Sequence, residues 1–104
     1  MDLYTTGEVA GKEIEQSLGM VRGNTIRAKN LGRDILAGFR NLIGGEIKDY
    51  TEMLSEARDE AISRMVKEAE DMNADGIVEV RFTTSETMGG AAEILVYGTA
   101  VKFK

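Results

Sequence analysis

DYTEMLSEARDEAISRMVKEAEDMN, residues 49–73, is the longest periodic stretch of the chain and contains neither glycine nor proline. Its interior consists mostly of Ala, Glu, Met, Leu, Lys and Arg, which are good helix formers. Asp49 and Glu52 have the spacing of a capping box, which predicts that the helix begins at Asp49. The Ala-Asp-Gly that follows Asn73 predicts a left-handed C-cap there. We therefore predict one long helix, around which the rest of the domain is built.

The apolar side of this helix is unusually wide. At about 100° per residue, one group of apolar residues shares a side and a second group continues it around the axis. The two groups are Tyr50, Met53, Leu54, Ala57, Ala61 and Met65, and then Ile62, Val66, Ala69 and Met72. This width predicts two neighbours: a sheet, and either another subunit or a loop of the same chain. Arg58 lies inside the apolar arc, either extended along apolar surface toward water or buried and paired with a carboxylate.

Composition limits the classes of function. With 104 residues, the chain is long enough for one domain, residues 1–104, with a modest core. Its 13 basic and 18 acidic residues give a net charge of −5, which argues against nucleic acid and anionic membranes as partners. The absence of Cys and His removes thiolate sites and the commonest metal ligand and general base. No signal peptide or membrane span is recognisable, so we expect a cytoplasmic protein.

The other elements follow from changes in hydrophobic period. We predict strands over 2–6, 19–28, 77–87 and 91–103, a short helix over 30–43, and a hairpin connection at 88–90; residues 14–18 fit a strand or a helical turn. Gly23-Asn24 predicts a bulge or tight turn. Val78, Val80 and Phe82 alternate with polar residues, as in a half-buried strand. The pattern is typical of an α+β domain with helices on one face of a mainly antiparallel sheet.

The last predicted strand is apolar on both faces. Leu95, Tyr97, Val101 and Phe103 share one face, and Ile94, Val96 and Ala100 share the other. A strand with this pattern is covered on both sides. We therefore expect it to lie centrally in the sheet or at a contact between subunits.

Candidate ligand-binding or interface residues are few: Arg33, Asp34, Arg40, Tyr50 and Arg58. Arg33 and Arg40 lie on the predicted short helix and could hold an anionic ligand if they converged with Arg58. Asp34 and Arg40 are equally explained as charges that complement the helix dipole. A carboxylate group near the end of the long helix lacks the spacing of a cation-binding loop and is typical of a solvated face; it comprises Glu68, Glu70, Asp71 and Asp75. No nucleophile has an assignable base, so we predict no catalytic residues and no cofactor.

Nearly the whole chain resembles the YbjQ-like family, small proteins often labelled heavy-metal-binding domains. The similarity lies in residues 11–26, 30–50, 55–82 and 97–103. Its most specific pieces are Arg33, Asp34, Arg40, Gly44, Gly45 and Tyr50, then Ala57-Arg58, then ADGIV at 74–78. The resemblance implies an α+β subunit with a dodecin-like core and one long and one short helix, assembled as a homo-oligomeric ring, with five subunits expected. No reaction is established for the family.

Three hypotheses follow. The first is a cytoplasmic, ring-forming, non-enzymatic binding or scaffold module, because the chain has excess apolar surface and no catalytic set. The second is a metal-ion binding protein, as the family label suggests, although soft metals prefer ligands that this chain lacks. The third is a binder of a small anionic ligand, or an enzyme, with a pocket between subunits that uses Arg33, Arg40 or Arg58.

Overall fold

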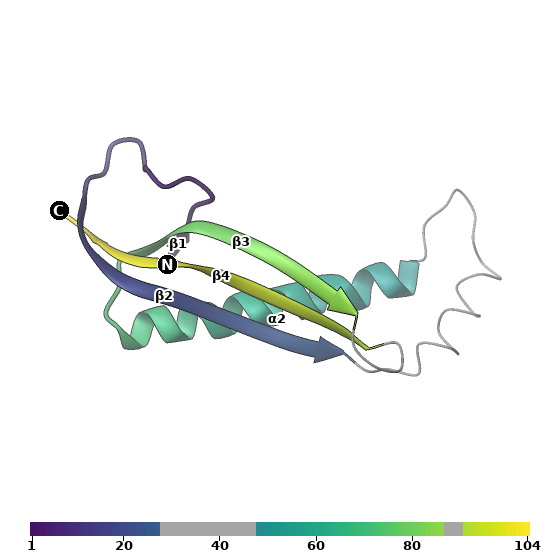
Figure 1. The fold of residues 1–104 in the computed structure, drawn as a ribbon. Helices are drawn as coiled ribbons and strands as arrows, with labels where there is room; N and C mark the ends of the chain where they lie inside the picture. Colours follow the sequence, from purple (N-terminus) through teal and green to yellow (C-terminus); the bar gives the residue numbers. More distant parts are fainter. Residues whose placement is uncertain (28–47, 87–90) are drawn as a thin grey trace.

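The computed structural model describes residues 1–27, 48–86 and 91–104 and shows a sheet with one long helix on one face (Figure 1). The elements are β1 (Asp2–Leu3), β2 (Ile14–Arg27), α2 (Lys48–Asp71), β3 (Gly76–Glu86) and β4 (Ala92–Phe103). The strands are ordered β1-β3-β4-β2; β1 runs parallel to β3, and β4 pairs antiparallel with both β3 and β2. The α+β class is therefore confirmed, with a mixed sheet. The predicted short helix at 30–43 and the hairpin connection at 88–90 lie outside the described residues.

Helix α2 ends in the predicted left-handed cap. Its last residue is Asp71, and Asn73 adopts a φ of 60°. The Ala74 N–H donates to the Ala69 carbonyl at 3.1 Å and the Asn73 N–H donates to the Glu70 carbonyl at 2.9 Å, the two hydrogen bonds of a Schellman motif. The predicted start is shifted: the helix begins at Lys48, so Asp49 is a helical residue rather than the cap.

Strand β2 is one continuous element, which settles the ambiguous residues 14–18 as strand. The predicted bulge or tight turn at Gly23-Asn24 is wrong, because Gly23 pairs regularly with Val96 and Asn24 with Leu95. The irregularities of the ladder lie near its start, between Ile14 and Gln16 and between Ser17 and Gly19. Glycine is needed at position 23 for packing instead. A Cβ there would overlap the Ala61 carbonyl oxygen and lie 2.6 Å from the Met65 nitrogen.

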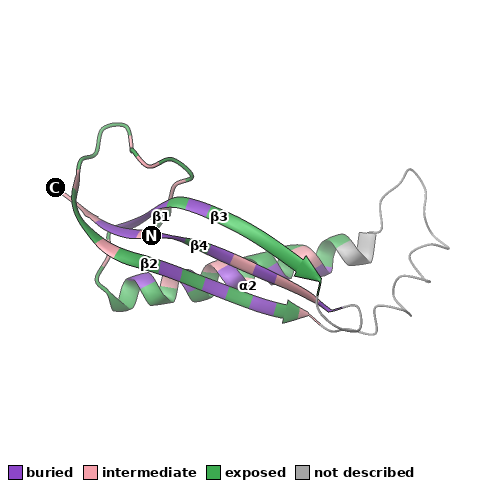
Figure 2. Ribbon diagram, viewed as in Figure 1, coloured by how far each residue is buried: buried purple, intermediate pink, exposed green. Residues whose placement is uncertain are grey.

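The core lies between α2 and the two strands β2 and β4. The helix contributes a row of buried residues at four-residue spacing: Ala57, Ala61, Met65 and Ala69. The sheet contributes Val21, Ile94, Val96 and Ala100. The Thr25 hydroxyl, also buried, donates to the Ala57 carbonyl at 3.1 Å. Figure 2 shows this alternation of buried and exposed residues along β2. The predicted helix face around Ala61 is therefore confirmed.

A bulge in β3 changes which residues face the helix. The pairing with β4 shifts between Val78 and Arg81, and Glu79 adopts a φ of 53°. The extra residue breaks the predicted alternation, which placed Val78, Val80 and Phe82 on one face. Val80 joins the core under the helix, whereas Val78 pairs with Thr99 on the opposite face. Phe82 pairs with Val96 on the helix side of the sheet but is 47% exposed.

The face of β4 turned away from α2 is covered at one end only. There Val101 is buried, and the Phe103 ring meets the Tyr4 ring edge-on at 6.2 Å between centroids. Farther along the strand, Leu95 is half-buried and Tyr97 is 37% exposed. The expected central position of β4 is confirmed, because the strand pairs with both β3 and β2. Its face turned away from α2 is nevertheless covered only near Phe103, because the N-terminal segment reaches only that end.

Candidate functional site

The predicted binding residues are only partly described. Arg33, Asp34 and Arg40 lie outside the described residues. Tyr50 lies in α2, but the structure does not describe its side chain. Arg58 is described, and it is exposed on α2. Whether the three arginines converge therefore stays a prediction.

Arg58 and Arg64 lie on opposite sides of α2 and have different surroundings. Arg64 donates to the Glu60 carboxylate and to the Asn24 carbonyl, each at 2.6 Å. Arg58 has no hydrogen bond or ion pair with any residue in the described part of the chain. Of the two alternatives predicted for Arg58, this favours the one in which its side chain extends along apolar surface toward water, rather than burial against a carboxylate.

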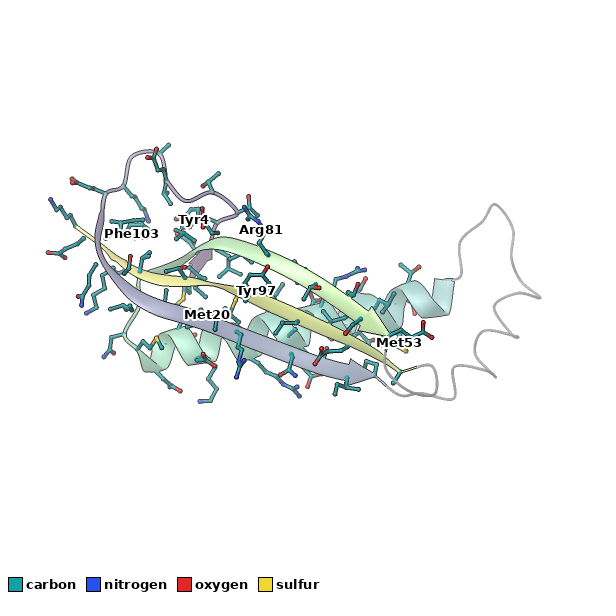
Figure 3. The ribbon with its side chains drawn as sticks, in the orientation of Figure 1. Tyr4, Met20, Met53, Arg81, Tyr97 and Phe103 are labelled. Atoms are coloured by element: carbon teal, nitrogen blue, oxygen red, sulfur yellow. The ribbon has the colours of Figure 1, made fainter. Side chains whose placement is uncertain are left out.

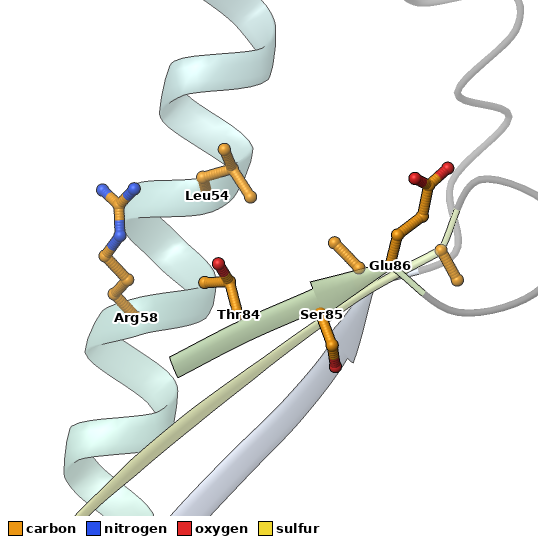
Figure 4. A pocket seen from close by; sticks show the side chains of 7 residues that line it. Leu54, Arg58, Thr84, Ser85 and Glu86 are labelled. Atoms are coloured by element: carbon orange, nitrogen blue, oxygen red, sulfur yellow. The ribbon is translucent and has the colours of Figure 1, made fainter. Parts of the chain in front are cut away.

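A pocket of about 330 Å³ lies where α2 passes the ends of β3 and β4 (Figure 4). It is lined by Leu54, Arg58, Thr84, Ser85, Glu86, Ala91 and Ala92. Figure 4 shows Arg58 and Glu86 on opposite sides of it, with Leu54 and Thr84 between them. The Ser85 hydroxyl donates to the Glu93 carboxylate at 3.4 Å, which is too long and too exposed to activate a nucleophile. The pocket can hold a small polar group, but its lining has no general-base arrangement.

A strip of incompletely covered apolar side chains lies on the same side of the molecule. Leu54, Ile62 and Val66 are half-buried along α2 at the four-residue spacing that also includes Arg58. Phe82 of β3 lies on the same, helix-facing side of the sheet and is 47% exposed. Figure 2 shows that the second half of β3 is exposed throughout. We call Leu54, Ile62, Val66 and Phe82 the β3 flank. The wide apolar arc predicted the three helix residues, whereas the bulge that places Phe82 on the same side of the sheet left no recognisable signal.

The sheet has open edges on both sides in the described part of the chain. Strand β2 is the last strand of the sheet and pairs only with β4. On the other side, β1 pairs with Gly76 and Ile77, and main-chain hydrogen bonds from residues 4–6 extend this pairing as far as Val80. On the side of β3 that faces away from β4, no described strand pairs with residues 81–86. Such edges present unpaired main-chain donors and acceptors to a further strand.

The described residues offer no obvious metal site or membrane span. No group of three or more His, Cys, Asp or Glu side chains within residues 1–27, 48–86 and 91–104 could hold a metal ion together. Among the predicted carboxylates, Asp75 accepts a hydrogen bond from the Phe103 N–H at 2.9 Å. No helix in the same part of the chain is long and apolar enough to cross a bilayer.

Comparison with known proteins assigns the chain to a family. The model of the YbjQ family, described as "Putative heavy-metal-binding", matches residues 1–104. A UPF0145 protein of Halorubrum lacusprofundi is 57% identical over 104 residues, covering 100% of both chains. One from Methanosarcina acetivorans is 60% identical over 102 residues, covering 98% of this chain and 96% of the relative.

A solved structure has the same fold. It is the crystal structure of a protein with unknown function of the DUF74 family from Pediococcus pentosaceus, with a TM-score of 0.62 and 20% identity, covering 100% of this chain and 98% of that one. This similarity concerns the fold alone. The full-length family match and the two close relatives show that the chain belongs to the YbjQ-like family, whose members are named UPF0145 proteins.

Proposed function

We propose that this protein is a non-enzymatic binding or scaffold module that functions as a ring of identical subunits in the cytoplasm. The β3 flank carries the proposal. Phe82 is 47% exposed there, and three aliphatic residues of α2 are half-buried. We infer that these side chains form one apolar surface around Arg58, and such a surface on a small domain is typical of a protein–protein contact. A second copy of the chain is the occupant that best fits it.

Charges on the two sides of α2 support contact with a second copy. The side toward the β3 flank carries Arg58, which is exposed and has no partner among the described residues. The opposite side carries Arg64 together with the three carboxylates of Glu56, Glu60 and Glu68, of which only Glu60 forms ion pairs within the described part. If the β3 flank of one copy packs against the other side of helix α2 in the next copy, Arg58 of the first copy lies near Glu56 or Glu68 of the second. Opposite charges on the two surfaces favour this pairing over like-against-like contact.

The geometry of this contact supports a ring. The two surfaces lie on different sides of the molecule, so the contact is head-to-tail rather than between identical patches. Repeated head-to-tail contacts form either a closed ring or an open filament. The open edges of β2 and of residues 81–86 in β3 lie on the same two sides and would be shielded in a closed ring. The family resemblance leads us to expect five subunits.

Native mass spectrometry and light scattering test the proposal. The wild-type protein should have the mass of a multiple of 11.4 kDa subunits at micromolar concentration. Phe82→Ser should lower that mass while retaining the circular dichroism of the fold, because Phe82 lies outside the core. Met20→Ser is the matched control, because it removes a large exposed residue from the opposite face of the sheet. A monomeric wild-type protein would overturn the proposal.

Metal-ion binding is a second candidate function, favoured by the description of the matched family. Because the chain contains neither Cys nor His, carboxylate, thioether or main-chain oxygen ligands would have to hold the ion. Calorimetric titration with zinc, copper(I), cadmium and calcium tests it. Stoichiometric heat with one of these ions would support the candidate, and absence of heat with all four would exclude it.

A further inference from the structure

A second unassigned feature lies on the sheet face opposite α2. Strand register places Arg22 of β2, Tyr97 of β4 and Arg81 of β3 in one row across the sheet. Directly opposed residues have Cβ atoms about 5 Å apart, so both arginines are within reach of a group held over the Tyr97 ring. All three residues are exposed, and Tyr97 is 37% exposed. Figure 3 shows Tyr97 on the central strand with Arg81 beside it on β3.

This row is locally cationic on an acidic protein. The chain has a net charge of −5, yet the row contains two arginines and no carboxylate. The carboxylate on the same face of β4 is Glu93, four residues along the strand from Tyr97. Asn24 donates to Glu93 at 3.5 Å and Ser85 donates to it at 3.4 Å. Glu93 therefore has nearer partners than the two arginines.

The two arginines differ in a way that suits ligand binding. The Arg81 guanidinium donates to the Thr5 and Val80 carbonyls at 2.7 and 2.9 Å. These neutral acceptors orient the group and leave its positive charge uncompensated. Arg22 has no hydrogen bond or ion pair with any described residue and can adjust its position. The Tyr97 hydroxyl likewise has no partner in the described part of the chain.

We propose that the row Arg22–Tyr97–Arg81 binds a small planar ligand that carries one anionic group, of the nucleoside monophosphate class. An exposed tyrosine ring stacks on a planar ring, and guanidinium groups form paired hydrogen bonds with a phosphate. A single nucleotide has one planar base, which would stack on Tyr97, and one phosphate, which the two arginines would bind. A longer nucleic acid is disfavoured, because a net charge of −5 repels a polyanion beyond the local row.

Isothermal titration with adenosine monophosphate, adenosine and inorganic phosphate tests the proposal. The monophosphate should bind at least about tenfold more tightly than adenosine or phosphate alone, because only it uses both the ring and the cations. Arg22→Gln and Tyr97→Leu should each weaken binding about tenfold. Arg64→Gln changes the net charge equally but lies on α2, and Tyr97→Phe keeps the stacking ring. Both of these controls should bind like the wild type.

Two results would overturn the proposal. The first is the absence of binding at millimolar monophosphate, or binding that Arg22→Gln and Tyr97→Leu leave unchanged. The second is a lowered assembled mass for Arg22→Gln, which would assign the row to a subunit contact instead. The inference does not depend on the ring, because the row and the β3 flank lie on opposite faces of the sheet. Phe82→Ser should therefore lose assembly and still bind the monophosphate.

Discussion

The two strands that flank β4 in this sheet, β2 and β3, differ sharply in how the helix covers them. Over β2, the helix main chain approaches so closely that Gly23 has no room for a side chain, and Thr25 donates to the helix carbonyl of Ala57. Over the second half of β3, no described helix covers the sheet and Phe82 is exposed. The more hydrophobic residue is thus the uncovered one. The helix lies over the strand whose small residues allow its backbone to approach closely, and not over the strand with the largest apolar side chain.

Among the variants that test this comparison, Gly23→Ala should lower the free energy of unfolding most. The new Cβ would overlap main-chain atoms of Ala61 and Met65, which cannot move aside as a flexible side chain can. We expect a loss of about 3 kcal/mol or more in the free energy of unfolding, measured by urea denaturation at fixed protein concentration. Arg22→Ala, at the adjacent exposed position of β2, serves as the control. If the two variants were equally stable, the close contact of α2 with β2 would be wrong.

Thr25→Val should have a smaller effect on the same side. Valine keeps the shape and the β-branching that suits a strand, but it removes the hydrogen bond to the Ala57 carbonyl. That carbonyl retains its hydrogen bond within the helix. The free energy of unfolding should fall by about 1 kcal/mol, measured in the same denaturation series. An increase in stability would show that burial of the hydroxyl outweighs its hydrogen bond.

Arg64→Ala and Arg58→Ala should have the smallest effects on folding, and they compare the two sides of the helix directly. The structure predicts the larger loss of fold stability for Arg64, because Arg64 bonds to Glu60 and Asn24, whereas Arg58 has no partner among the described residues. Arg64→Ala should lower stability by about 0.5–1 kcal/mol, less in high salt.

The effect of Arg58→Ala should appear in assembly instead. We expect its free energy of unfolding at low protein concentration to stay within about 0.5 kcal/mol of the wild type. Its assembled mass by light scattering should fall, because the proposed contact between copies would lose its cation. A variant that lost fold stability but kept its mass would place Arg58 in an interaction within the subunit.

Local signals predicted the elements and failed at particular backbone positions. The central helix, its cap at Asn73, the buried face at Ala61 and the strands β3 and β4 were all recognisable from period and cap residues. Gly23 was predicted as part of a bulge or tight turn, but a glycine inside a strand pattern signals a close backbone approach as readily as a bulge. The bulge that exists is at Glu79, where a non-glycine residue adopts a φ of 53°. Nothing in that residue type indicates such a conformation.

The candidate sites were predictable to a lesser extent. Arg58 was singled out from its place in the apolar arc, and the structure places it on the wall of a pocket. The row of Arg22, Tyr97 and Arg81 was not predicted, because its members are up to 75 residues apart and meet only through strand register. Phe82 was predicted as a core residue of β3 and is instead exposed on the helix side of the sheet.

By itself, the sequence determined the α+β class, the long helix and its buried face, and membership of the family, because these depend on period, cap residues and composition. Tertiary structure alone decided which strand the helix covers, which face of β4 stays open and which arginines become neighbours. These outcomes depend on backbone approach at Gly23, on one extra residue at Glu79 and on pairing between distant strands. Each arises from contacts between segments that no local pattern encodes.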